Sequence, residues 1–313
     1  MLIADDLTGA CDAAVPFVGH GYRATVLLDL DRAELHDGVL AVNTDSRNDN
    51  SCDMHRVACA FRGVRPRILF KKIDSTLRGS AGAEVAAALE AFGCEAAVIT
   101  PAFPGTGRIV EAGRLRVVDR DDFEPVDVAE HFGPHGLTQF LAGDVVSDAD
   151  LDQVVAEGLA ARRRILWVGS GGLAAALARA IARPKGAADK PRTPGKVLFV
   201  IGSDHPVTLE QQRHLLEAHP DSAVLHLECG LGGRLAQARG LAGALFLSGG
   251  DTAAMVCRTI EARAIELDDE LITGIPLGRI AGGWFDGVPV VTKSGGFGRP
   301  DALIQVVEYF TCR

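Results

Sequence analysis

The chain has few aromatic residues and no excess of positive charge, and these two absences exclude several classes of partner. Aromatic side chains make up 5% of the 313 residues, so the stacking surfaces that hold unpaired bases are scarce. Lys and Arg number 32 against 41 Asp and Glu, which gives a net charge of −9 and no general affinity for a phosphate backbone. We therefore expect neither a nucleic acid nor a membrane as a partner.

Long apolar runs and paired cysteines are also missing. No apolar stretch approaches the roughly 20 residues of a membrane-spanning helix, and the N-terminus has no basic segment followed by an apolar signal core. The seven cysteines are odd in number and include no C-x-x-C pair, which is typical of reduced thiols rather than of a disulfide or zinc framework. We expect a soluble cytoplasmic protein.

The residues that are present indicate an α/β protein of two domains. An apolar content of 47% is enough for buried cores, and 313 residues exceed one ordinary domain. Strand-like runs alternate with alanine-rich helical stretches, which predicts two layered α/β domains with mostly parallel sheets and an interdomain cleft. The segment 184–195 holds three prolines and little apolar surface, so we expect a linker there between domains at 1–183 and 196–313.

The expected elements follow this alternation on both sides of the linker. Before it we expect strands at 1–4, 23–28, 38–43, 67–73, 96–100 and 164–168, and helices at 8–20, 51–62, 80–93 and 148–162, with loops and a short strand pair in 103–146. After it we expect strands at 196–201, 222–227, 243–247 and near 271–276 and 288–292, and helices at 206–218, 231–240, 251–262 and 300–309.

A polar cluster directly follows the first four apolar residues. Asp5, Asp6 and Thr8 lie where a strand ends and a helix begins, which is where α/β proteins bind ligands. A single acid or hydroxyl would be enough to cap the helix. Two adjacent carboxylates therefore favour a site, although a simple cap remains the alternative.

Two further strand ends in the first domain combine cations with hydroxyls and a carboxylate. The end of the strand at 67–73 carries Lys72, Asp74, Ser75 and Arg78. This set suits a small polyhydroxy anion, since arginine can bind a carboxylate through two parallel hydrogen bonds and aspartate can accept hydrogen bonds from hydroxyls. Arg108 follows a Pro/Gly loop and could close on an acidic ligand or a phosphate. Solvated turns are the alternative for both segments.

Two glycine loops in the second domain have the composition of phosphate cradles. In Ser248-Gly249-Gly250-Asp251-Thr252 the glycines allow close approach of a ligand, and the free N–H groups of the next helix favour an anion. The Asp251 carboxylate and the Thr252 hydroxyl could add oxygen ligands for magnesium. The segment from Lys293 to Gly298 includes Gly295 and Gly296, and Lys293 can supply charge to phosphoryl oxygens.

Other patterns carry less weight. Ser203 and His205 open a helix, and we expect at most a binding role for His205. Residues 169–174 fit G-x-G-x-x-A, but the acid that a dinucleotide site needs about 20 residues later falls in the linker, so we interpret these glycines as a close-packed turn or a lip of the cleft. His131 and His135 are separated by Gly133 and Pro134, which defeats a helical metal pair.

Taken together and in order, these segments resemble the four-carbon acid sugar kinase family. The resemblance runs from residue 1 to about residue 300 and rests on five motifs: Ile3 to Ala10 with Asp12, Lys72 to Gly79, Pro101 to Pro104 with Gly107 and Arg108, Ser248 to Thr252, and Lys293 to Gly298. It implies an N-terminal domain that binds a sugar acid and a C-terminal domain that binds ATP. It assigns one group of residues to the sugar acid (Asp5, Asp6, Thr8, Asp74, Ser75, Arg78) and another to ATP (Ser203, Gly249 to Thr252, Gly296).

The implied activity is ATP-dependent phosphorylation of the C4 hydroxyl of threonate, erythronate or an oxo-tetronate, with Mg²⁺ on the triphosphate. Asp5, Asp6 and Asp74 are the candidates for the base that accepts the hydroxyl proton, and the sequence does not choose among them. The chain is shorter than typical members, so we expect either that its start lies late or that it is a compact variant. Two alternatives stay open, a degenerate homologue that binds without catalysis and a nicotinamide-dependent oxidoreductase, and so does a homodimer.

Overall fold

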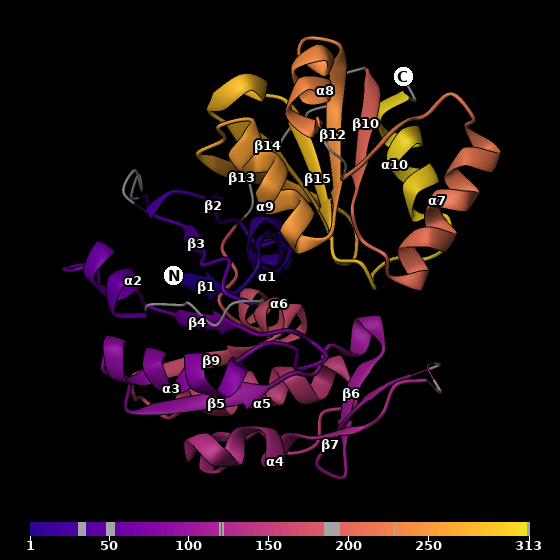
Figure 1. The fold of residues 1–313 in the computed structure, drawn as a ribbon. Helices are drawn as coiled ribbons and strands as arrows, with labels where there is room; N and C mark the ends of the chain where they lie inside the picture. Colours follow the sequence, from indigo (N-terminus) through magenta and orange to yellow (C-terminus); the bar gives the residue numbers. More distant parts are fainter. Residues whose placement is uncertain are drawn as a thin grey trace.

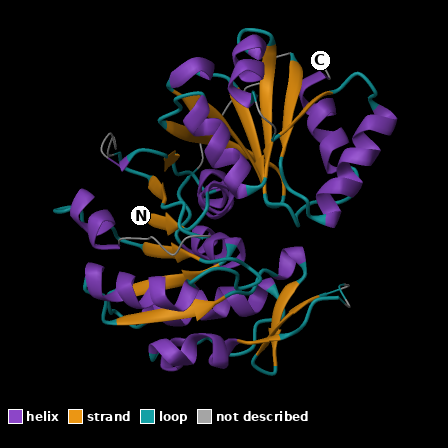
Figure 2. Ribbon diagram, viewed as in Figure 1, coloured by secondary structure: helices purple, strands orange, loops and turns teal. Residues whose placement is uncertain are grey.

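The computed structural model describes residues 1–30, 36–47, 54–118, 120, 122–184, 195–227 and 230–311. Helices cover both faces of a central, mostly parallel sheet, and the chain divides into an N-terminal half (1–184) and a C-terminal half (195–311), as Figures 1 and 2 show. The α/β class is therefore confirmed. Helix α1 (Leu7–Gly19) lies between the halves and packs against elements of both.

The N-terminal half is built on six parallel strands. Their order in the sheet is β2-β3-β1-β4-β9-β5, with bounds β1 Leu2–Ala4, β2 Ala24–Leu27, β3 Val39–Asn43, β4 Leu69–Lys72, β5 Ala96–Thr100 and β9 Ile165–Gly169. The helices that accompany α1 are α2 Met54–Ala60, α3 Ala81–Phe92, α5 Asp148–Ala160 and α6 Gly171–Ala180. Helix α6 is absent from the sequence-based prediction, because its glycine-rich first turn reads as a loop.

The C-terminal half contains four parallel strands and an antiparallel hairpin. The parallel strands are β10 Lys196–Ile201, β11 Ala223–His226, β12 Ala242–Ser248 and β15 Pro289–Lys293, and the hairpin is β13 Ala264–Ile272 with β14 Ile275–Ala281. The helices are α7 Pro206–Ala218, α8 Leu231–Ala238, α9 Gly250–Thr259 and α10 Ala302–Thr311, with a short 3-10 turn at Gly283–Phe285. Side chains of β12 are buried on both faces of the sheet, as expected for a central parallel strand.

The hairpin joins the two halves into one sheet. Strand β13 pairs antiparallel with β2, from Ala264 opposite Leu27 to Leu267 opposite Ala24, so twelve strands form one continuous sheet. The prediction of a single strand near 271–276 was wrong, because that range contains the turn of the hairpin at Gly274. Three consecutive acidic residues in β13, Asp268 to Glu270, hide the apolar alternation that would have marked this strand.

A small second sheet extends from the N-terminal half towards the seam. Strands β6 Arg108–Glu111, β7 Arg114–Val117 and β8 Val126–Asp127 form it, beside α4 Val128–Phe132 and 3-10 turns at Pro104–Thr106, Gly133–His135 and Thr138–Phe140. Its first residue, Arg108, reaches the C-terminal half. The larger apolar core also crosses the seam, since Ile3, Leu7 and Val256 belong to one buried cluster. Within the described ranges, no helix combines the length and apolarity needed to cross a bilayer.

Candidate active site between the two halves

A cavity of about 790 Å³ lies between the halves, at the carboxyl ends of strands from both. Loops after β1 and β4 form one side, and loops after β10, β12 and β15 form the other. It brings together most residues singled out from the sequence: Asp6, Thr8, Lys72, Asp74, Ser75, Arg78, Arg108, Ser203, Gly249, Gly250, Asp251, Thr252, Gly295 and Gly296. Asp5 and Lys293 are buried behind this lining instead.

Asp6 is both the cap of helix α1 and part of the cavity wall. Its Oδ1 accepts a hydrogen bond from the backbone N–H of Gly9 at 3.0 Å, and its Oδ2 accepts one from the Thr8 hydroxyl at 2.7 Å. The capping and site interpretations of this carboxylate are therefore compatible. The cap fixes the orientation of the side chain, and only 4% of the residue is exposed.

Arg47, which the sequence analysis did not single out, connects the three candidate aspartates. Its guanidinium donates to both carboxylate oxygens of Asp5 at 2.8 Å and to Oδ1 of Asp6 at 2.8 Å, and it lies 3.6 Å from Oδ1 of Asp74. Burial raises the pKa of Asp5, but the charges of Lys71 and Arg47 outweigh this and hold it below its ordinary value. The sequence did contain one indication that Arg47 belongs to the site, because this residue follows the end of the strand predicted at 38–43.

The loop after β4 locks Asp74 in place. Arg78 donates to its Oδ1 at 2.8 Å and to its Oδ2 at 3.1 Å, and the backbone N–H and hydroxyl of Thr76 also donate to Oδ2. Burial raises the pKa of Asp74, yet the Arg78 hydrogen bonds and the Arg47 charge hold it well below its ordinary value. Leu77 adopts a left-handed φ of 60°, the strained turn that folds the loop around this carboxylate.

Lys72 faces the cavity from β4 and has only a loose ion pair behind it. Its ammonium donates to the carbonyl of Ile73 at 2.9 Å and lies 3.9 Å from Oδ2 of Asp12. Burial raises the pKa of Asp12 to about 7, although the Lys72 charge opposes this, and Oδ1 of Asp12 has no hydrogen-bond partner. The Asp12 carboxylate packs against Gly171 in α6, so the glycines at 169–172 form a close-packed turn beside the cavity.

The first glycine loop opens helix α9 towards Asp6. Gly249 has a φ of 101° and no side chain caps the helix, so the N–H groups of its first turn are available to an anion. A Cβ added at Gly250 would collide with Oδ2 of Asp6. The carboxylate of the N-terminal half and the anion-binding helix end of the C-terminal half are thus in direct contact.

The second glycine loop is held from inside by Lys293. The ammonium donates to the hydroxyl of Thr208 and the carbonyls of Ser294 and Gly295, each at 3.0 Å, and it is fully buried. Burial lowers the pKa of Lys293 to about 7. The Ser294 hydroxyl donates to Thr8 across the seam at 3.1 Å. Lys293 therefore shapes the loop, and the loop in turn touches the Asp6 cluster.

The site also shows how the groups required for phosphoryl transfer could be held. The start of α9, where no side chain of the described residues caps the helix, and the glycines at 295 and 296, which line the same cavity, suit a triphosphate. Among the described residues, no cluster of three or more metal-ligating side chains occurs.

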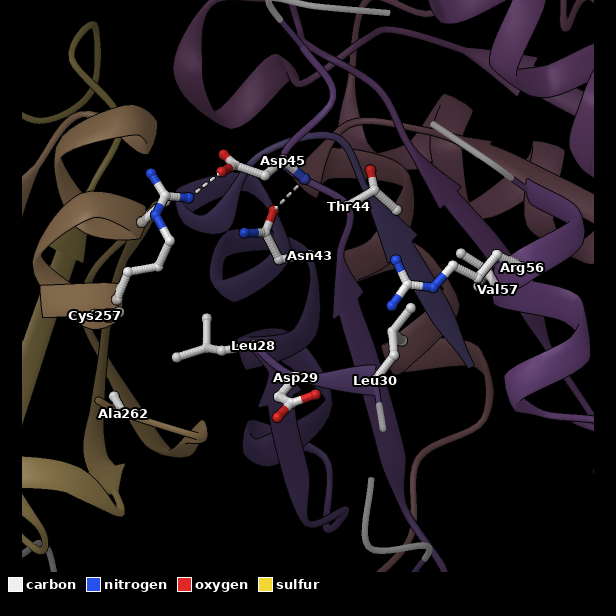
Figure 3. Close-up of a pocket in the computed structure, with 12 residues that line it drawn as sticks. Leu28, Asp29, Leu30, Asn43, Thr44, Asp45, Arg56, Val57, Cys257 and Ala262 are labelled. Carbon is white, nitrogen blue, oxygen red and sulfur yellow. Dashed lines mark hydrogen bonds and ion pairs between the residues drawn. The ribbon is translucent and has the colours of Figure 1, made fainter. Parts of the chain in front are cut away.

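A second cavity, of about 360 Å³, lies elsewhere along the seam. Figure 3 shows Asn43, the last residue of β3, and Asp45 between Cys257 of α9 on one side and Arg56 of α2 on the other. An ion pair between Asp45 and Arg258 crosses this cavity and ties the halves together. None of the residues singled out from the sequence line it, and no glycine loop opens into it.

These features define a two-part α/β phosphotransferase, with a polar pocket in one half and an anion cradle in the other. Residues 1–133 match the family model described as a sugar-binding N-terminal domain, and residues 226–303 match that of a nucleotide-binding C-terminal domain. The chain is 32% identical to a D-threonate kinase of Bordetella bronchiseptica over 98% of this chain and 96% of that relative. The chain belongs to the four-carbon acid sugar kinase family.

Two further comparisons agree with that membership. A D-erythronate kinase of Heliobacterium modesticaldum is 28% identical over 99% of this chain and 96% of its own length. A solved Haemophilus influenzae protein of the DUF1537 family shares the fold, with a TM-score of 0.68 and 18% identity over 99% of each chain. The alignment with the D-threonate kinase spans 400 positions against 313 residues here, so this chain is the more compact of the two. The protein is an ATP-dependent kinase of four-carbon sugar acids.

Proposed function

We propose that this kinase transfers the γ-phosphoryl group of ATP to the C4 hydroxyl of a sugar acid of the threonate, erythronate or oxo-tetronate type. The observation that carries the proposal is the contact between the Asp6 carboxylate and the first turn of α9 at Gly250. An acceptor hydroxyl bound beside Asp6 would face a phosphate held at this helix end. Phosphoryl transfer depends on such positioning and on neutralisation of charge.

In this proposal each half of the protein binds one of the two substrates. Residues 1–183 form the sugar-acid domain and 196–313 the nucleotide domain. The proposed linker at 184–195 falls almost entirely outside the described residues. Thr8, Lys72 and Ser75 are available to hydroxyls and the carboxylate of the acid, with Arg78 at the rim of the same pocket.

Asp6 is the base that the geometry favours among the three aspartates. All three carboxylates accept hydrogen bonds from neighbouring groups, so occupancy does not separate them. Asp5 does not line the cavity, whereas Asp6 lines it and is the aspartate that contacts the first turn of α9 at Gly250. In the step, the C4 oxygen forms a bond to the γ-phosphorus while the bond to the β,γ-bridging oxygen breaks. ADP leaves with that electron pair, and the hydroxyl proton passes to Asp6.

The nucleotide side would use backbone rather than side-chain groups. Gly249 to Thr252, together with Ser203, Gly295 and Gly296, would cradle the triphosphate, and Lys293 would stabilise that cradle from beneath. Mg²⁺ would neutralise phosphate charge, with Asp6 or Asp251 as the carboxylates near enough to the cradle to assist.

A coupled ADP-release assay with a panel of four-carbon sugar acids tests the proposal. We expect turnover with at least one threonate-type or erythronate-type acid, and a product whose phosphorus couples to the C4 protons in NMR spectra. Turnover on a different hydroxyl would refute the C4 assignment. Tight binding by calorimetry without any turnover would instead identify a non-catalytic binding protein. Light scattering on the same sample decides whether the kinase is a homodimer.

A further inference from the structure

Arg108 belongs to the sugar-acid half, where it donates to the carbonyl of Thr106, but its side chain also reaches the nucleotide half. It is the first residue of β6, and its guanidinium stacks over the Phe297 ring at 5.1 Å from the ring centre. Its Nη2 lies 3.4 Å from the carbonyl oxygen of Gly296. Phe103, just before the β6 hairpin, packs edge-on against the same Phe297 ring. The side chain is therefore held at the seam from both halves.

The charge of Arg108 has no carboxylate partner among the described residues. The other guanidinium groups that line the cavity each have one: Arg47 pairs with Asp5 and Asp6, Arg78 with Asp74, and Arg120 with Asp122. Arg108 instead donates to two backbone carbonyls, and its buried Nε has no hydrogen-bond partner within the described ranges. A half-buried cation with a buried, unused donor is costly unless a bound anion completes it.

The surroundings favour a phosphoryl group as that anion over the carboxylate of the sugar acid. Arg108 lies against the glycine loop. A Cβ added at Gly296 would be 3.3 Å from Nη2 of Arg108, so the glycine leaves space for the guanidinium. The His205 ring, from the nucleotide half, lies on the same side of Gly296, since its Nε2 would be 3.2 Å from a Cβ added there. Lys72, by contrast, faces the cavity from β4 within the sugar-acid half, where a substrate carboxylate would lie.

We propose that Arg108 is a catalytic residue that binds the γ-phosphoryl group during its transfer and reaches it from the sugar-acid half. The inference rests on the proposed function. While the C4–O–P bond forms and the β,γ-bridging bond breaks, the guanidinium donates hydrogen bonds to the equatorial phosphoryl oxygens. Arg108 gains and loses no proton, because Asp6 takes the hydroxyl proton. An arginine in this position is worth about 10³ to 10⁵ in turnover in other phosphoryl-transfer enzymes.

This arrangement would also couple catalysis to closure of the halves. Arg108 is carried by one half, and the phosphate cradle by the other. The charge on the transferring group is then neutralised only when the seam is closed, as it is here with Arg108 against Gly296. ATP bound without a closed sugar-acid half would lack this stabilisation, which would limit its hydrolysis by water.

Steady-state kinetics of Arg108→Met and Arg108→Lys test the role. Methionine retains an apolar stem against Phe297 but removes the charge. We expect kcat of Arg108→Met to fall about 10²-fold to 10⁴-fold, with KM for the sugar acid changed less than about threefold. Arg108→Lys should recover part of kcat. The matched control is Arg116→Met, an exposed arginine on the paired strand of the same hairpin, and it should keep wild-type kinetics.

A binding measurement separates catalysis from folding. Calorimetry with ADP, aluminium fluoride and the sugar acid should show at least about tenfold weaker binding for Arg108→Met, while ADP alone binds as to the wild type. A rise in KM for the acid with kcat retained would assign Arg108 to the substrate carboxylate and overturn the proposal, as would unchanged kinetics. A wild type that phosphorylates no acid would overturn the proposed function as well, whereas an active wild type with an equally active Arg108→Met overturns only this inference.

Discussion

The Asp6 carboxylate of the sugar-acid half touches Gly250, the first residue of helix α9 in the nucleotide half. No side chain other than hydrogen fits at residue 250, because a Cβ there would collide with Oδ2 of Asp6. The contact places a proton acceptor at the positive end of an uncapped helix, where a phosphate is expected to bind. It also makes Asp6 and Gly250 the two residues whose substitution tests the site most directly.

Replacement of Asp6 by asparagine should remove the base and preserve the shape of the side chain. We expect kcat in the ADP-release assay to fall about 10²-fold to 10⁴-fold, the usual contribution of a general base. Asp152→Asn, which alters an exposed carboxylate paired with Arg179, is the matched control and should keep wild-type turnover. Full activity of Asp6→Asn would move the base to another group.

Alanine at position 250 should disturb the contact without straining the backbone. Gly250 is helical, and the three atoms nearest to an added methyl group all belong to the Asp6 side chain. We expect kcat/KM for ATP to fall at least tenfold, since a misplacement of about 1 Å in such a site can cost about 10²-fold. Gly233→Ala in α8, where a Cβ meets no atom within 4 Å, should leave activity unchanged and stabilise the fold by about 0.5 to 1 kcal/mol. Equal activity of both variants would show that the contact is unimportant.

Loss of Arg47 should destabilise the protein as well as inactivate it. Arg47→Met leaves the buried carboxylates of Asp5 and Asp6 without their shared cation. We expect the free energy of unfolding to fall by about 3 to 5 kcal/mol, as for other buried pairs that lose one partner. Arg23→Met breaks the exposed pair with Glu266 and should cost less than about 1 kcal/mol. Urea denaturation of both variants measures the difference, and equal losses would contradict the buried network.

The stability contribution of Asp12 should depend on pH in the direction opposite to most carboxylates. Burial raises its pKa in the folded protein from 3.8 to about 7, against the opposing charge of Lys72 and with the repulsion of Glu270 and Asp6. The folded state therefore binds more protons than the unfolded state between about pH 4 and pH 7, and stability falls as the pH rises through this window.

Asp12→Asn removes that titration and should be more stable than the wild type at pH 8 by about 1 to 3 kcal/mol, given about 1.4 kcal/mol per pKa unit and some relaxation of the site. The advantage should shrink towards pH 4. Denaturation curves at both pH values measure it. A variant that is no more stable than the wild type at pH 8 would show that Asp12 remains ionised in the fold at little cost.

Much of the fold could be predicted because local patterns and tertiary packing agree. Helix α7 spans Pro206–Ala218 as expected, and the strand β5 at Ala96–Thr100 matches its predicted range. The hairpin of β13 and β14 could not be predicted from the sequence. The acidic residues of β13 lie on a half-exposed surface, and they interrupt the alternation of apolar and polar residues that is typical of a strand. Its pairing with β2 joins residues more than 230 positions apart, which no local pattern can indicate.

The candidate site shows the same division. Motifs at strand ends predicted which segments contain polar groups, because parallel strands present their carboxyl ends to ligands. Arg47 was not singled out, since one arginine after a strand resembles many solvated arginines. The loop lysine Lys293 suggested a phosphate ligand, whereas its ammonium is enclosed by carbonyls of its own loop. The assignment of each residue to a substrate stays a prediction that the experiments above decide.

The sequence by itself determined the α/β class, the order of most strands and helices, and the family, because apolar periodicity and glycine-rich strand ends are local properties of the chain. Only the tertiary structure decided which charges neutralise one another. Arg47 binds Asp5 and Asp6, Arg78 binds Asp74, and Arg108 lies at the seam with no carboxylate partner in the described part of the chain. Ion pairing depends on distances of a few ångströms between segments far apart in the chain, and those distances exist only after the two halves have packed together.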